Sequence, residues 1–122
     1  AVENLEHYPV DFWDEVLEQS DASRCIDIGH LWMDNQDPVD YLMKHIQRAR
    51  VIHIHGFNGR DHKSLANVPR DELKRVFDFI IKEKYNAVIT IEVFEKGDFL
   101  TSIQTINQIL TQDTIEELWE KK

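Results

Sequence analysis

The chain has 122 residues, the length of one domain, and no apolar run approaches the ~20 residues that a membrane span needs. With 23 acidic against 14 basic residues the formal charge is −9, which repels a polyphosphate backbone and argues against nucleic acid as a partner. Cys25 is the single cysteine, so an internal disulfide framework is excluded and a reducing cytoplasm is the expected location.

Strands and helices are predicted to alternate along the chain. Short β-branched runs bounded by turn-forming residues predict four strands, at residues 1–5, 24–28, 51–55 and 87–94. Apolar residues with helical spacing follow each strand, at residues 12–19, 39–46, 73–81 and 100–110. Asp37 and Asp98 are the expected caps of the second and fourth of these helices. A highly charged stretch at residues 114–122 predicts a terminal helix packed on the outside.

This alternation predicts an α/β fold. Strand followed by helix, repeated four times, is typical of parallel strands joined by right-handed crossovers. The sequence contains no low-complexity linker and no domain boundary, so residues 1–122 are expected to form one domain. Each helix supplies one apolar stripe that needs a sheet to pack on.

Polar side chains occupy one face of every predicted strand. Side chains alternate along a strand, so residues of equal parity share a face. In the third strand His53 and His55 therefore oppose two isoleucines, and the other strands follow the same rule. The residues that share this polar face near the carboxyl ends of the strands are Glu3, Asp27, His53, His55 and Glu92.

Such a face predicts a bound metal ion. Unpaired charges in a dry core would cost several kcal/mol each, so something must neutralise them. Any one of these residues taken alone is explained as well by a hydrogen-bonded core histidine or a solvated glutamate, but four strands agreeing in parity favour a shared cation. Carboxylate and imidazole ligands suit zinc, manganese, cobalt or iron alike. The pattern leaves open whether His53 or His55 is the ligand.

Further candidates lie in the predicted loops. His30 follows Gly29 just beyond the second strand, and Asp61 and His62 lie in the glycine-flanked loop after the third. They are expected to hold a second metal or to serve in acid–base chemistry and substrate contacts, the alternative being ordinary solvent-exposed polar residues. Arg60 offers a planar fork for an anionic substrate group, although a solvated arginine explains it almost as well.

Five motifs in chain order resemble a known superfamily. "ENL", "CIDIGH", "HIHG", "GRDHKSL" and "IEVF" are similar to the xylose-isomerase-like (β/α)8 barrels, which include the apurinic endonuclease IV group and the sugar-phosphate isomerases and epimerases. Within the superfamily, "DIGHLW", "VIHIHG" and "ITIEVF" look most like the cobamide-remodelling phosphodiesterases. The resemblance covers nearly the whole chain.

The resemblance implies roles for particular residues. It implies metal ligands at Glu3, Asp27, His55 and Glu92, with His53 as the competing alignment and a substrate contact. His30 and His62, with Asp61, match residues that bind a further metal or substrate, and Arg60 would meet the substrate. In the endonuclease group the aspartate stands two places before the histidine, whereas Asp61 is adjacent to His62, which puts a third metal in doubt.

The resemblance also implies an incomplete barrel. The family's barrel has eight strands, and the four predicted here correspond to its strands five through eight. The chain starts without a methionine, as if cut inside a strand. A half-barrel exposes two sheet edges, so we expect a fragment, a complementary half-barrel chain or a homodimer.

The expected activity is hydrolysis of a phosphodiester, possible substrates being the cobamide nucleotide loop or another small phosphorylated or sugar-like molecule. A divalent metal would activate the water. The alternative is an isomerase or epimerase of a sugar or sugar phosphate, with Glu3 and Glu92 as paired acid–base groups. A third alternative is a non-catalytic half-barrel, since an isolated half can be inactive.

Overall fold

The computed structural model describes the backbone of residues 1–120 and the side chains of residues 1–111, and it contains a four-stranded parallel sheet. The strands lie in chain order and are β1 (Val2–Glu3), β2 (Arg24–Asp27), β3 (Ala49–Ile54) and β4 (Val88–Ile91). All three neighbouring pairs are parallel. The predicted α/β class is therefore confirmed, and the sheet is compatible with half of a barrel.

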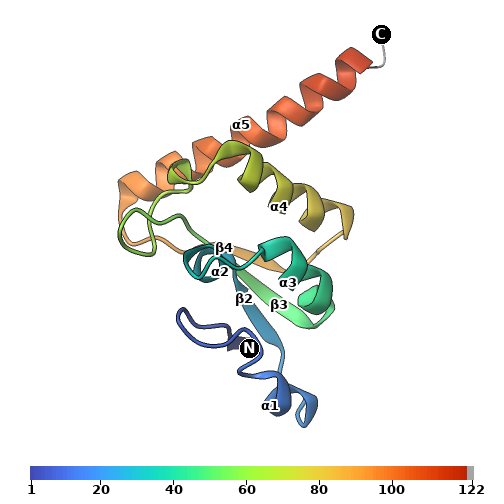
Figure 1. Ribbon diagram of the computed structural model, residues 1–122. Helices are drawn as coiled ribbons and strands as arrows, with labels where there is room; N and C mark the ends of the chain where they lie inside the picture. The colour runs from blue at the N-terminus through green and yellow to red at the C-terminus, as the bar shows by residue number, and fades with distance from the viewer. Residues whose placement is uncertain (121–122) are drawn as a thin grey trace.

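Helices fill the connections between the strands (Figure 1). The α-helices are α1 (Asp14–Glu18), α2 (Ile28–Met33), α3 (Pro38–His45), α4 (Arg70–Lys82) and α5 (Lys96–Glu120). Two short 3-10 helices, η1 (Ile46–Arg48) and η2 (Leu65–Asn67), precede β3 and α4. Among the described helices, none combines the length and the apolar character that crossing a membrane requires.

The helix boundaries test the predicted caps. Asp37 caps α3 as expected, because its side chain accepts a hydrogen bond from the Val39 amide at 2.9 Å. The prediction that Asp98 caps the last helix was wrong: α5 already begins at Lys96, and Asp98 lies in its first turn. The helix runs on to Glu120 and so includes residues 114–120, whereas residues 121–122 lie outside the described part of the chain.

One face of the sheet carries the hydrophobic core. Ile26, Ile52 and Ile54 have no exposed surface and pack against the helices. The α-helical side chains of this core come mainly from α4, with smaller shares from α2, α3 and α5; they are Ile28, Leu31, Tyr41, Leu42, Leu73, Val76, Phe77, Ile80 and Ile109. Burial of these side chains places the polar residues of the strands on the opposite face.

The second strand leads directly into a helix that the sequence analysis did not expect. Asp27, the last residue of β2, is also the N-cap of α2, and its Oδ1 accepts a hydrogen bond from the His30 amide at 2.9 Å. His30 was expected in a loop after Gly29, and this expectation was wrong. The cap puts the His30 side chain on a rigid helical turn next to Asp27.

The outer strand β4 and the helix α5 leave apolar side chains exposed. Val88 is 57% exposed and Ile89 is 37% exposed, and on α5 only part of the predicted apolar stripe is covered. Ile109 is buried there, while Leu100 and Ile103 are exposed. This side of the molecule therefore presents apolar surface next to an open sheet edge.

Candidate metal centre

Four side chains from four successive strand regions meet above the sheet. They are Glu3, Asp27, His53 and Glu92, named here the carboxylate group, and each offers one ligand atom within 4.8 Å of the others. His53 Nδ1 is at its centre, 2.9 Å from Glu92 Oε2, 3.4 Å from Glu3 Oε1 and 3.9 Å from Asp27 Oδ2. Such a set of oxygen and nitrogen donors could hold a divalent metal ion.

The strand register brings these residues together. Asp27 and His53 are direct partners across β2 and β3, and Glu3 stands opposite Cys25 across β1 and β2. Glu92 follows β4 directly, and its amide donates a hydrogen bond to the Ile54 carbonyl at 3.0 Å, which extends the ladder by one residue. The parallel sheet thus places every member at the carboxyl end of its strand.

Asn4 holds the first strand against Asp27. Its side-chain Oδ1 accepts a hydrogen bond from the Asp27 amide at 2.7 Å, and its Nδ2 donates to the Asp27 carbonyl at 3.0 Å. The side chain thereby replaces the backbone partner that β1, only two residues long, does not supply. Asn4 is buried, and its side chain fixes the position of the Asp27 backbone.

Several polar atoms of the centre are buried and lack a hydrogen bond. Among the described side chains these atoms are Asp27 Oδ2, His53 Nδ1, His55 Nε2 and Glu92 Oε2. Buried polar atoms nearly always find a partner, because leaving one unpaired costs ~1–3 kcal/mol. These four atoms lie close together at the carboxyl ends of the strands, where a bound group could pair with them.

The charges of the centre shift two carboxyl pKa values in opposite directions. Burial raises the pKa of Glu3 to about 7, and the neighbouring Asp27 adds to this rise. Burial also acts to raise the pKa of Asp27, but the close polar contacts with His55 and Glu3 and the charge of His55 outweigh it and hold the pKa at about 2. Asp27 is therefore ionised at neutral pH, while Glu3 is partly protonated.

Three histidines form a second group beside the first. His30, His55 and His62 each offer a ring nitrogen within 4.8 Å of the others and are named here the histidine group. Asp27 joins the two groups, since its Oδ1 lies 3.0 Å from His55 Nε2 and its Oδ2 lies 3.5 Å from His30 Nδ1. The fully buried His55 ring packs against Gly29, where a Cβ atom would overlap it.

Backbone carbonyls orient the histidine rings. His30 Nδ1 lies 2.9 Å from the Asn4 carbonyl and His62 Nδ1 lies 3.1 Å from the Glu92 carbonyl. A carbonyl accepts only, so both Nδ1 atoms act as donors to these carbonyls, and His62 Nε2 faces the Asp61 carboxylate at 3.1 Å. His55 Nδ1 has two neighbours, the Gly56 carbonyl at 3.0 Å and the His62 amide at 3.1 Å. The tautomer in which Nδ1 accepts from the His62 amide carries its proton on Nε2, which faces Asp27 Oδ1 at 3.0 Å.

A closed loop carries the remaining candidates. Gly56 and Lys63 form an isolated antiparallel bridge, which ties the two ends of the loop together. His62 adopts a φ of 56°, a left-handed conformation that a non-glycine residue holds only when its surroundings enforce it. Asp61 Oδ2 lies 3.1 Å from His62 Nε2, and Arg60 is exposed on the same loop.

The structure groups the predicted ligands differently from the sequence analysis. His53, the competing assignment, lies with the three carboxylates, and His55 lies with His30 and His62 instead. The reason is that β3 ends at Ile54, so the alternation that governs strand side chains no longer applies to His55. The sequence analysis missed Asn4 and Cys25; Cys25 has the parity of Asp27 and could have been found by that signal.

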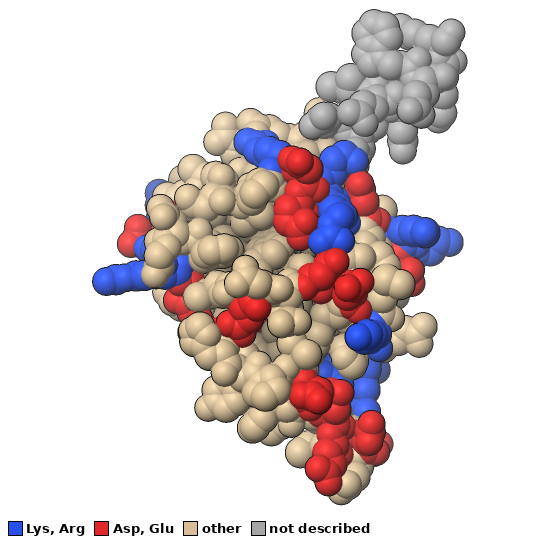
Figure 2. Space-filling view, viewed as in Figure 1, with Lys and Arg blue, Asp and Glu red and all other residues tan. Residues whose placement is uncertain are grey.

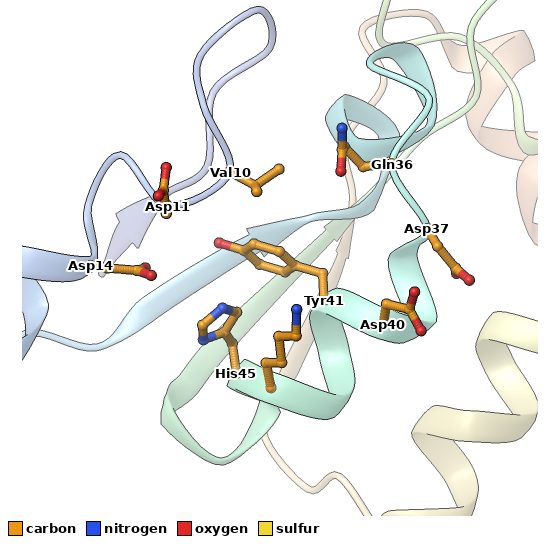
Figure 3. Close-up of a pocket in the computed structure, with 9 residues that line it drawn as sticks. Val10, Asp11, Asp14, Gln36, Asp37, Asp40, Tyr41 and His45 are labelled. Atoms are coloured by element: carbon orange, nitrogen blue, oxygen red, sulfur yellow. The ribbon is translucent and has the colours of Figure 1, made fainter.

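The groove drawn in Figure 3 is separate from this centre. It lies between the N-terminal segment and α3 and has a volume of about 250 Å³, with Asp11, Asp14, Asp37 and Asp40 among its lining residues. Arg24 bridges its two sides by donating to Asp14 Oδ1 at 2.7 Å and to the Tyr41 hydroxyl at 3.1 Å. The described side chains whose donor atoms converge tightly enough for a cation lie elsewhere, in the centre above the sheet.

Comparison of the chain with protein-family models, with curated proteins and with solved structures finds no match in any of the three.

Proposed function

We propose that this chain provides the metal centre of a divalent-metal-dependent hydrolase that acts on a phosphodiester. The observation that carries the proposal is the convergence of Glu3, Asp27, His53 and Glu92 from four strand regions. Two donors ~2.1 Å from one ion at a tetrahedral angle lie ~3.4 Å apart. The three distances from His53 Nδ1, 2.9, 3.4 and 3.9 Å, are centred on that value.

The charge of the group supports a cation rather than a hydrogen-bonded network. Three carboxylates lie around one imidazole, and Asp27 among them is fully buried and anionic. A divalent cation would provide partners for the unpaired atoms of Asp27, His53 and Glu92 together. Zinc, manganese, cobalt and iron all accept such mixed ligands.

The residues around the group suit hydrolysis. A divalent cation, when bound, supplies Lewis acidity toward a phosphoryl oxygen and a water whose pKa falls toward ~7. His30 donates through Nδ1 to the Asn4 carbonyl, so its Nε2 would be available to orient the attacking water. The His62 ring lies between the Glu92 carbonyl and Asp61 and would orient the leaving group. Asp61 holds His62 from the other side of the ring, and the exposed Arg60 can pair with a phosphate oxygen.

A specific observation favours a second candidate function, an isomerase or epimerase of a small sugar or sugar phosphate. Burial and Asp27 raise the pKa of Glu3 to about 7, the value that suits a general acid–base group at neutral pH. Glu92 approaches the same nitrogen of His53, so the two carboxyl groups lie close enough to act in turn on a bound hydroxy-ketone. Hydrolysis releases an alcohol from its phosphate, whereas isomerisation conserves the mass of the substrate.

We infer that the four strands form half of a (β/α)8 barrel and that a second copy or a complementary half-barrel chain closes it. The support is the exposed apolar surface of β4 and α5, where Val88, Leu100 and Ile103 face solvent beside an unpaired strand edge. Pairing β4 with a first strand from another half would cover this edge. Closure would also build the second wall of a substrate pocket.

The distribution of charge fits a small substrate. On the face in Figure 2, acidic side chains interrupt the lysines and arginines, and acidic side chains gather at the end that carries α1. A formal charge of −9 repels a nucleic-acid backbone at long range. A single phosphodiester needs only local positive charge, which a metal ion and Arg60 would supply.

The experiment is a paired measurement of metal binding and activity. Calorimetric titration with zinc, cobalt and manganese should show one tight site, and bis(p-nitrophenyl) phosphate should be hydrolysed only with metal. Glu92→Gln should abolish both, while Glu95→Gln, an exposed neighbour, should leave both intact. Full metal binding by Glu92→Gln would contradict the metal assignment. Binding without hydrolysis, but with interconversion of an aldose and a ketose, would favour the isomerase, and a metal-free monomer would favour a non-catalytic half-barrel.

A further inference from the structure

Cys25 lies against two members of the carboxylate group. It is the register partner of Glu3 across β1 and β2, and it has the parity of Asp27 on the same strand. Its sulfur, a carboxylate oxygen of Glu3 and a ring nitrogen of His53 all lie within 4.8 Å of one another. The thiol is 6% exposed and unoxidised, so it is a buried sulfur directly beneath the group.

A second observation points to a ligand at this place. The Asp27 side chain has no exposed surface, and its Oδ2 has no hydrogen-bond partner although it lies 3.9 Å from His53 Nδ1. His53 Nδ1 is likewise without a hydrogen bond and lies 3.4 Å from Glu3 Oε1, close to the ~3.4 Å expected for two tetrahedral donors. The unpartnered atoms therefore lie at the same His53 ring that the thiol approaches.

The cross-strand neighbours of Cys25 also distinguish it from an ordinary core thiol. Its cross-strand partner on β3 is Val51, and the next partner on β4 is Val88, which together form an aliphatic floor. The layer above consists of Asp27, His53 and Thr90. Cys25 is the member of the floor that is adjacent to Glu3, so its sulfur can reach the ion position from below.

We propose that Cys25 supplies a thiolate ligand to the cation held by Glu3 and His53, and that this ligand makes the site select zinc, cobalt or cadmium over magnesium and manganese. The inference rests on the proposed metal centre and deepens it. When sulfur binds the cation, the thiol proton leaves to solvent and no electron is transferred. Thiolate ligands favour the softer cations, whereas magnesium and manganese prefer oxygen.

The first test uses the full chain loaded with cobalt. Wild-type protein should show a thiolate-to-cobalt charge-transfer band in the near ultraviolet, and Cys25→Ser should lose that band while its visible cobalt bands remain. The same substitution should lower cadmium affinity by more than ~10-fold, the lower end of what loss of a supporting group costs, and leave manganese affinity unchanged. Identical near-ultraviolet spectra of the two cobalt-loaded proteins would overturn the inference and leave the metal centre intact.

The second test needs no variant and therefore does not depend on how the variant folds. X-ray absorption at the zinc edge of the wild-type protein should show one sulfur neighbour at ~2.3 Å among nitrogen and oxygen neighbours. A shell of nitrogen and oxygen alone would refute thiolate ligation. If neither zinc nor cobalt binds the wild-type chain, the proposed function itself fails, and this outcome differs from binding without sulfur.

Discussion

Asp27 and His53 are cross-strand partners on β2 and β3, and their side chains meet above the sheet with Asp27 Oδ2 3.9 Å from His53 Nδ1. Both atoms are buried without a hydrogen bond. The backbone register alone therefore sets two prospective ligands side by side. The other members of the centre are arranged around this pair.

The roles of His53, in β3, and His55, just after it, can be distinguished by substitution. His53→Ala should remove tight metal binding, because His53 Nδ1 is the atom that all three carboxylates approach. His55→Ala should retain binding at the carboxylate group, since His55 contacts Asp27 from the histidine group. Calorimetric titration measures the difference, with His45→Ala, at the end of α3, as the control. The reverse order of effects would show that His55 is the ligand.

Gly29 is required by the close approach of the His55 ring. Gly29→Ala should destabilise the fold by ~1–3 kcal/mol, because the added methyl group would overlap a fully buried ring. Gly97→Ala is the matched control: it lies in the first turn of α5 with no atom near the new methyl group and should be neutral or stabilising by up to ~1 kcal/mol. Urea denaturation compares the two, and equal stability of both variants would refute the contact.

Asn4 is expected to be a positioning residue. Asn4→Ala would leave the buried amide and carbonyl of Asp27 without their partners at 2.7 and 3.0 Å and should cost roughly 1–3 kcal/mol. It should also weaken metal binding, because the Asn4 side chain holds the backbone of Asp27, a proposed ligand. Asn67→Ala, near η2, serves as the control for a generic loss of an asparagine. Unchanged metal affinity in a folded Asn4→Ala protein would show that Asn4 acts on stability alone.

The stability of the metal-free protein should fall as pH rises from about 4.5 to about 7. The pKa of Glu3 is raised from 4.5 to about 7 in the folded state, so the folded state binds the proton more tightly and is favoured at low pH. His55, whose pKa Asp27 raises against the effect of burial, adds a further loss of stability that begins near pH 6.5 and continues above it. The lowered pKa of Asp27 acts in another window, since its contribution is lost only as pH falls from 3.8 toward about 2.

Glu3→Gln should reduce this slope, and the remainder should come from His55. Denaturation of the chelator-treated protein at pH 5 and pH 8 measures it, with Glu18→Gln on the exposed side of α1 as the control. Saturating metal should reverse the trend, because metal binding favours deprotonated ligands. A slope in Glu3→Gln equal to that of the wild type would contradict the raised pKa of Glu3.

The sequence predicted the sheet and most of the centre because two simple periodicities apply there. Alternation along β2 and β3 separated Asp27 and His53 from the buried isoleucines, and helical spacing located α3 and α4. The parallel arrangement then required the polar ends of the strands to lie at one edge of the sheet. These features depend on local pattern and connectivity, which a sequence contains.

The features that could not be predicted depend on where a strand stops and on what packs across it. Alternation cannot assign His55, because β3 ends one residue before it and the ring then packs on Gly29. The helical position of His30 results from the N-cap that Asp27 provides, and the role of Asn4 results from a side chain taking the place of a strand. Each is a tertiary contact between residues that no periodicity relates.

The most direct measurement is an anomalous difference map from crystals of this chain grown with zinc. The account predicts one strong peak within bonding distance of Glu3, Asp27, His53 and Glu92, at ~2.0–2.2 Å from their oxygen and nitrogen atoms. A well-ordered sheet with these four side chains and no peak between them, or a peak bound elsewhere, would contradict it.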